Sequence, residues 1–108
     1  MEGKILFVEL WGCRKEQIDS VDFLMDAVKE IAKACRLTIL NTMHHRFRPQ
    51  GVSVISMIAE SHIATYSWPE KDYLSVFIYT CGKEDPEAAL PLIKEKFVHS
   101  RIMKRTWD

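Results

Sequence analysis

Alternating apolar and polar positions predict most of the strands of this chain. Residues 4–11, which read K-I-L-F-V-E-L-W, are rich in β-branched and aromatic side chains and predict a first strand. The same criteria predict five further strands, at residues 37–41, 52–59, 61–68, 73–81 and 100–106. Between the predicted strands at residues 37–41 and 52–59, the polar residues 44–51 are predicted to form a loop.

A spacing of three and four residues between apolar positions predicts a helix after the first strand. Ser20 is a suitable N-cap, and the helix is expected to run to about Arg36. Its apolar stripe consists of Val21, Leu24, Val28, Ile31 and Cys35. A second helix is predicted from Asp85 and Pro86, and Pro91 is expected to kink or shorten it. This order predicts an α+β fold, a two-layer sandwich with two helices on one face of a mostly antiparallel sheet.

The second face of that sheet lacks a predicted cover. In the strand at residues 73–81, Leu74, Val76 and Ile78 point to one side. The other side carries mostly aromatic residues, namely Tyr73, Phe77 and Tyr79. We expect both sides to pack against something, because both are apolar. Two helices cover only one face, so a second copy of the chain is a candidate partner for the other.

Composition and charge limit the classes of function. The chain has 108 residues and a mass of 12.6 kDa, which suits a single domain, residues 1–108. Its 15 basic and 15 acidic side chains cancel, and this balance argues against nucleic acid as the main partner. Three cysteines without a C-x-x-C pair argue against a disulfide framework or a zinc site and favour a cytoplasmic location. No signal peptide or apolar run of about 20 residues is visible, so no membrane association is expected.

Individual side chains give only weak chemical signals. His44 and His45 could bind a metal, but a pair of loop histidines is more often polar surface, so no metal is expected. Cys81 is either a reactive thiol or a small residue buried at a strand end. Ser61 beside His62 could be an activated serine, but neighbours in a strand point to opposite faces, and no G-x-S-x-G elbow is present. The residues alone therefore predict a soluble α+β domain and leave its function open.

The order of several short motifs is more informative. They are Gly51-Val52-Ser53, Ile58-Ala59-Glu60-Ser61-His62, Trp68-Pro69-Glu70 and Tyr79-Thr80-Cys81-Gly82. In this order and spacing the motifs resemble the short prokaryotic S-adenosylmethionine decarboxylase proenzymes. The resemblance covers nearly the whole chain, including Trp11-Gly12-Cys13 and the Phe47-x-Pro49-Gln50-Gly51 loop.

The resemblance implies a self-processing enzyme. The proenzyme, or zymogen, would cut itself between Glu60 and Ser61, giving a β chain of residues 1–60 and an α chain of residues 61–108. Ser61 would become a covalent pyruvoyl group, and neither a metal nor pyridoxal phosphate would be needed. That group would form a Schiff base with the substrate amine and accept the electrons released with carbon dioxide. Cys81 would return a proton to the former α-carbon.

The resemblance also implies a substrate and a partner. Phe47 and Trp68 would stack on the adenine and face the sulfonium cation of S-adenosylmethionine. Glu70 would bind the ribose hydroxyls, and Ser53 would belong to the same substrate site. The product would supply aminopropyl groups for spermidine and other polyamines. The β/α protomers would pair as a homodimer, and the second subunit is a possible contributor to the site.

Two positions depart from the family pattern. Tyr66 stands where the family usually has the histidine that removes the Ser61 α-proton during processing, and a phenol is a poor base near neutral pH. Phe77 stands where an acidic residue is usual. These departures leave open an altered Tyr66, a substitute base such as His62, slow processing, or a changed substrate. The alternatives are therefore a pyruvoyl-dependent arginine or ornithine decarboxylase and a processing-deficient, non-catalytic paralogue.

Overall fold

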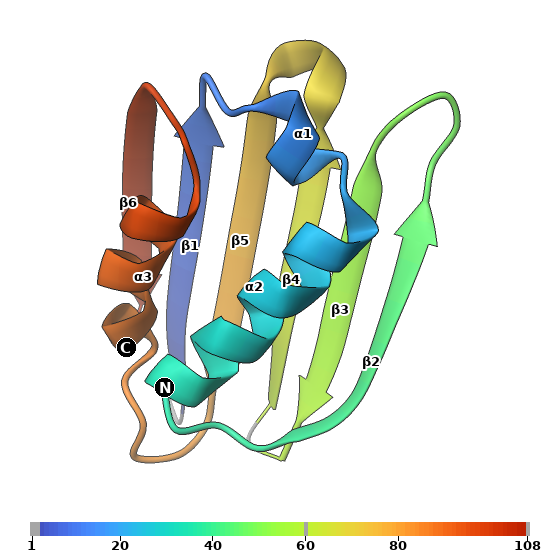
Figure 1. Cartoon of the computed structure of the whole chain (residues 1–108). Coiled ribbons are helices and arrows are strands. Elements are labelled where there is room, and N and C mark those ends of the chain that lie inside the picture. The colour runs from blue at the N-terminus through green and yellow to red at the C-terminus, as the bar shows by residue number, and fades with distance from the viewer. Residues whose placement is uncertain (1–2, 60, 108) are drawn as a thin grey trace.

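A six-stranded antiparallel sheet forms one layer of the molecule (Figure 1). The structure, a computed structural model, describes residues 3–59 and 61–107. The strands are β1 (Lys4–Trp11), β2 (Ile39–Arg46), β3 (Val52–Ile58), β4 (Ser61–Trp68), β5 (Tyr73–Thr80) and β6 (Arg101–Trp107). They lie in the order β2-β3-β4-β5-β1-β6, and every neighbouring pair is antiparallel.

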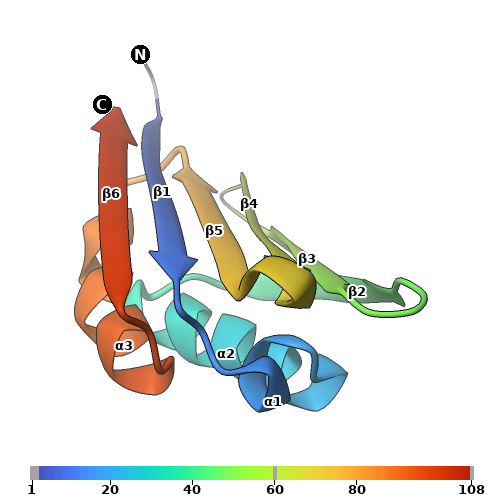
Figure 2. The ribbon, with the colours of Figure 1, turned by 90° about the horizontal axis from the view of Figure 1, so that it is seen from above.

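The α-helices form the second layer, and they lie on the same face of the sheet (Figure 2). They are α1 (Lys15–Ile18), α2 (Val21–Ala34) and α3 (Leu90–Lys96). Of the two short 3₁₀ helices, η1 (Pro69–Lys71) connects β4 to β5 and η2 (Pro86–Ala89) precedes α3. The predicted α+β fold, with two main helices packed against one face of the sheet, is confirmed. The one-turn helix α1 and η1 are additions that the sequence pattern did not predict.

The longest helix forms as its sequence predicts. The Ser20 hydroxyl caps α2 by accepting a hydrogen bond from the Phe23 N–H at 3.1 Å. Leu24, Val28 and Ile31 are buried against the sheet. They meet the inward-facing residues of the central strands, among them Leu6, Val8, Leu10, Leu74, Val76 and Ile78, all fully buried. Each such side chain contributes about 1.5–3 kcal/mol of transfer free energy, so this interface holds the two layers together.

The opposite face of the sheet is covered by none of the described elements (Figure 2). Here β4 exposes Tyr66 and Trp68, and β3 exposes Met57. Tyr73 and Phe77 of β5 are only partly buried on this side. We call this surface the open face. Within one copy of the chain, the prediction that both sides of β5 pack against something holds only for the helix-covered side.

Two local predictions need correction. The predicted loop at residues 44–51 is shorter, because His44 and His45 lie in β2 and pair with Val54 and Ser53 of β3. Only residues 47–51 connect the two strands. Pro91 lies in the first turn of α3, where a helix needs no N–H donor, and it therefore marks the change from η2 to α3. No helix in the described ranges is long and apolar enough to cross a membrane.

Candidate active site

Ser61 lies at a tight reversal of the chain. It is the first residue of β4, and it pairs with Ile58, the last residue of β3. Ala59 forms a turn between the two strands. Glu60, the predicted carbonyl side of the cleavage site, lies outside the described residues. The fold therefore places Ser61 at the junction of two strands, as predicted.

The Ser61 hydroxyl contacts the ring of His62, contrary to the expectation from strand geometry. Ser61 Oγ and His62 Nδ1 are 3.3 Å apart. The expectation failed because alternation describes residues inside a strand, whereas Ser61 is the first residue after the turn. The His62 ring stacks on Phe77, with ring centroids 5.7 Å apart and planes 11° apart. Tyr79 packs against the same ring at a tilt of 57° and 5.8 Å.

Cys81 directly follows the strand that pairs with Ser61. Ser61 pairs with Thr80 of β5, and Cys81 is the next residue along the chain, exposed at the strand end. The other two cysteines lie in the core. Burial raises the pKa of both Cys13 and Cys35 to about 11, because it disfavours the thiolate. Of the three cysteines, Cys81 is therefore the exposed one.

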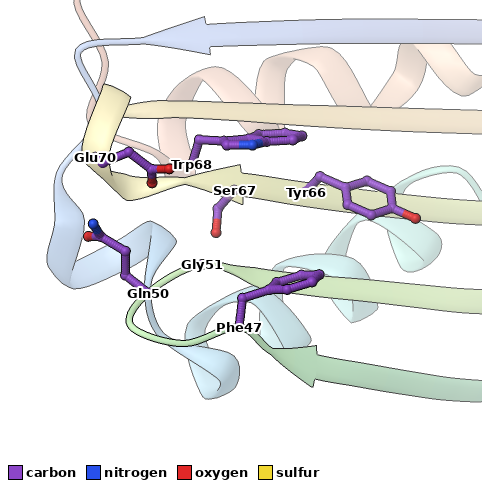
Figure 3. A pocket seen from close by; sticks show the side chains of 7 residues that line it. All are labelled: Phe47, Gln50, Gly51, Tyr66, Ser67, Trp68 and Glu70. Atoms are coloured by element: carbon purple, nitrogen blue, oxygen red, sulfur yellow. The ribbon is translucent and has the colours of Figure 1, made fainter.

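A second group of predicted residues lines a pocket at the other end of β3 and β4 (Figure 3). Its volume is about 390 Å³, and its walls are Phe47, Gln50, Gly51, Tyr66, Ser67, Trp68 and Glu70. Phe47 and Trp68 lie on opposite sides of the pocket, and Glu70 lies at one end with Gln50 (Figure 3). We call it the aromatic pocket. The structure thus brings three of the four predicted substrate-binding residues together.

The loop that carries Phe47 is fixed by a residue distant in sequence. Asp19, directly after α1, accepts a hydrogen bond from the Gly51 N–H at 2.9 Å. The same carboxylate lies 3.3 Å from the Arg46 guanidinium. The Phe47 N–H donates to the Gly51 carbonyl at 2.8 Å, and Gly51 has φ of 109°, a conformation that favours glycine. Asp19 was not among the predicted site residues, because no motif connects it to this loop.

Ser53 and Tyr66 form a pair on the open face. They are opposite each other in the β3–β4 ladder. Ser53 is only 7% exposed, and among the described residues its hydroxyl is the buried side-chain oxygen that lacks a hydrogen-bond partner. Tyr66 is 38% exposed and faces the aromatic pocket. It lies five positions after Ser61 in β4, a separation of about 16 Å in a strand, so it does not reach Ser61 of the same copy.

Ser61 has a separate pocket on the open face. This pocket, which we call the serine pocket, has a volume of about 280 Å³ and is lined by Asn41, Met43, Ile55, Met57, Ser61 and His62. Trp68 in the aromatic pocket lies seven positions along β4 from Ser61, about 23 Å in an extended strand. The predicted site residues therefore fall into two groups at opposite ends of β4. Cys81 belongs with Ser61, and Ser53, Tyr66, Phe47, Trp68 and Glu70 belong to the other group.

A partly buried polar cluster accounts for the acidic residue on β1. Glu9 was expected to place a carboxylate among apolar neighbours. The Tyr73 hydroxyl donates to it at 2.7 Å, and the Arg105 guanidinium does so at 2.7 Å. The Tyr73 hydrogen bond, followed by that from Arg105, lowers the pKa of Glu9. In the described ranges, no group of three or more His, Cys, Asp or Glu side chains could hold a metal ion.

Comparison with known proteins identifies the family. The S-adenosylmethionine decarboxylase family model matches residues 4–108. An S-adenosylmethionine decarboxylase proenzyme from Synechococcus sp. (strain WH7803) is 39% identical over 97 residues, which are 89% of this chain and 76% of that one. Its counterpart from Methanococcus aeolicus is 37% identical over 94 residues, 86% of this chain and 80% of the other. The crystal structure of the adenosylmethionine decarboxylase from Aquifex aeolicus has a TM-score of 0.87 at 28% identity, covering 97% of this chain and 88% of that one.

The fold and the two pockets fit the class of small self-processing decarboxylases. The chain belongs to the S-adenosylmethionine decarboxylase family, as a short prokaryotic proenzyme. The predicted family and enzyme class, a self-processing carboxy-lyase, are thereby confirmed. The roles of the individual residues stay predictions and are taken up below.

Proposed function

We propose that this chain cuts itself before Ser61 and then decarboxylates S-adenosylmethionine for polyamine synthesis in the cytoplasm. The observation that carries the proposal is the setting of Ser61. It begins a strand directly after a reversal, its hydroxyl contacts His62, and its backbone pairs with the residue before Cys81. Family membership supplies the reaction, and this setting supplies a serine at the start of a strand, directly after the turn at Ala59.

The surroundings of Ser61 fit a pyruvoyl group. Such a group needs an accessible position and a proton donor nearby, and the serine pocket and Cys81 offer both. Once formed, the pyruvoyl carbonyl would supply the electron sink that decarboxylation requires. The Cys81 thiol would then protonate the carbon that loses carbon dioxide. A thiol suits this role, because its S–H group can donate a proton.

The aromatic pocket suits an adenosyl group better than an arginine or ornithine side chain. Phe47 and Trp68 face each other across it, so an adenine ring can stack between them. Stacked aromatic faces also attract a sulfonium cation, by about 0.5–2 kcal/mol. The Glu70 carboxylate at the end of the pocket can accept hydrogen bonds from two ribose hydroxyls. Arginine and ornithine contain neither an aromatic ring nor a diol for these groups to bind.

We further propose that one active site combines the serine pocket of one copy with the aromatic pocket of a second copy. The distance of about 23 Å between Ser61 and Trp68 in a strand exceeds the length of one substrate molecule. Pairing two open faces about a twofold axis would bring the opposite ends of the two β4 strands together. Such a homodimer of β/α protomers would also cover the exposed aromatic side chains of this face.

Two measurements on the purified protein test the proposed function. Intact mass spectrometry is expected to show two chains, with the chain that begins at position 61 lacking an ordinary amino terminus. Release of labelled carbon dioxide is then compared for S-adenosylmethionine, arginine and ornithine, and S-adenosylmethionine is expected to be the substrate. A single uncut species of 12.6 kDa would contradict the proposal and favour the processing-deficient paralogue. Release of carbon dioxide from arginine or ornithine but not from S-adenosylmethionine would contradict the proposed substrate.

A further inference from the structure

We infer that His62 is the base that activates Ser61 for self-cleavage in this chain, an inference that rests on the proposed function. The imidazole Nδ1 of His62 lies 3.3 Å from the hydroxyl oxygen of Ser61. General bases act from such a distance, and their contacts are often longer before the reaction begins. Nδ1 can accept the hydroxyl proton when the ring carries its own proton on Nε2.

Two aromatic side chains hold the His62 ring in place. Phe77 stacks on it with planes 11° apart, and Tyr79 packs against it from the same strand. Both belong to β5, which pairs with β4 in this region. An aromatic stack limits rotation of the imidazole and keeps Nδ1 directed at Ser61. Phe77, one of the two departures from the family pattern, thus has a defined contact in this chain.

Tyr66, the second departure, does not supply this base within one copy of the chain. Tyr66 lies in the aromatic pocket, about 16 Å along β4 from Ser61. Even if a second copy brings Tyr66 to Ser61, a phenol is a poor proton acceptor near neutral pH. The His62 imidazole needs no second copy to reach the hydroxyl.

The cleavage step balances without any further reactant. Ser61 Oγ adds to the carbonyl carbon of the preceding residue while its proton passes to His62 Nδ1. The bond between that carbon and the Ser61 nitrogen then breaks, and His62 returns the proton to the leaving nitrogen, which becomes an amine. One amide bond is exchanged for one ester bond, and His62 is unchanged at the end. The later loss of the Ser61 α-proton, which opens the ester, is a separate step.

The inference is tested by following cleavage of freshly made chains. Wild type, His62→Ala, His62→Gln and His44→Ala are produced by cell-free translation with a labelled amino acid, and uncut chain is measured over time. Hydroxylamine, which cleaves esters and spares amides, is added to samples of each. His44 is the matched control, because it is an exposed histidine of β2 outside both pockets. Circular dichroism and thermal unfolding of the purified variants check the fold.

We expect both His62 variants to cut at least about 10²-fold more slowly than wild type, as loss of a general base predicts. They should remain resistant to hydroxylamine, because the block precedes the ester, and added imidazole should restore cutting of His62→Ala. His44→Ala should cut like wild type. Cutting of folded His62→Ala within twofold of wild type would overturn the inference, and so would accumulation of a hydroxylamine-sensitive ester. A wild-type chain that never cuts would instead overturn the proposed function and, with it, this inference.

Discussion

Complementation between two inactive variants tests whether the active site spans two copies of the chain. Ser61→Ala removes the residue that we propose becomes the pyruvoyl group, and Glu70→Ala removes the proposed ribose ligand. Glu70 would make two charge-assisted hydrogen bonds of about 1.5–3 kcal/mol each, so its loss should lower kcat/KM by about 10²-fold or more. Each variant alone should therefore be nearly inactive.

The expected recovery follows from the separation of the two pockets. Ser61 and Glu70 lie at opposite ends of β4, so a site shared between copies takes Ser61 from one and Glu70 from the other. When the variants are co-expressed equally, half of the dimers are mixed, and each mixed dimer has one site with both residues intact. The mixture should therefore reach about a quarter of the wild-type activity. If each site lies within one copy, no mixed dimer contains an intact site.

The assay is release of labelled carbon dioxide from S-adenosylmethionine by equal amounts of co-expressed protein. Ser61→Ala co-expressed with Cys81→Ala serves as the control, because Ser61 pairs with Thr80, the residue before Cys81, and both would enter the same site from one copy. That pair should not complement. Activity of the Ser61→Ala and Glu70→Ala mixture no higher than that of Glu70→Ala alone would refute the shared site, provided that size-exclusion chromatography shows dimers.

Three further substitutions give separate tests. Ser61→Ala should abolish cleavage and leave thermal unfolding nearly unchanged, because it removes one hydroxyl; cutting at the wild-type rate, seen by mass spectrometry, would contradict the assigned nucleophile. Tyr66→His should accelerate cleavage in the same assay if position 66 supplies the base for α-proton loss, whereas an unchanged rate would remove Tyr66 from processing. Asp19→Ala should raise KM about 3- to 10-fold with little change in kcat, because it removes the hydrogen bond to the Gly51 N–H that anchors the Phe47 loop. The ion pair of Asp19 with Arg46 is exposed to solvent and should contribute little to this effect. Steady-state kinetics checks the last prediction, and a fall in kcat at constant KM would contradict it.

The local elements of the fold could be predicted because each strand and helix carries its own pattern. The inward residues of β1 alternate with less buried ones, and those of α2 follow a spacing of three and four. The order of strands could not be predicted in the same way. Lys4 pairs with Thr80 and Ile5 with Trp107, and no local pattern reports a pairing across so much of the chain.

The second strand shows where the pattern itself misleads. β2 is the edge strand of the sheet, and most of its side chains are exposed, including His44 and His45. Without a buried face, its sequence has no reason to alternate, so its polar half was predicted as a loop. Pairing of Arg46 with Val52 of β3 extends the strand three residues into that polar run.

Motifs located the reactive residues, but their contacts required coordinates. Ser61 and Cys81 are recognisable in the sequence, and their closeness follows only from the β4–β5 register. The contact between Ser61 and His62 contradicted the expectation for neighbours in a strand. Asp19, which fixes the Phe47 loop, belongs to no motif, so it became visible only through its hydrogen bonds.

The open face connects three observations that a single copy of the chain leaves unexplained. Its strands are apolar on both sides although helices cover only one. The Ser53 hydroxyl is buried on it without a partner among the described residues, and a buried hydroxyl left unpaired costs about 1–3 kcal/mol. The serine pocket and the aromatic pocket, the two proposed halves of the substrate site, lie at its opposite ends. One arrangement answers all three: a second copy placed face to face would bury the aromatic residues, offer Ser53 a partner or a substrate, and join the serine pocket to the aromatic pocket.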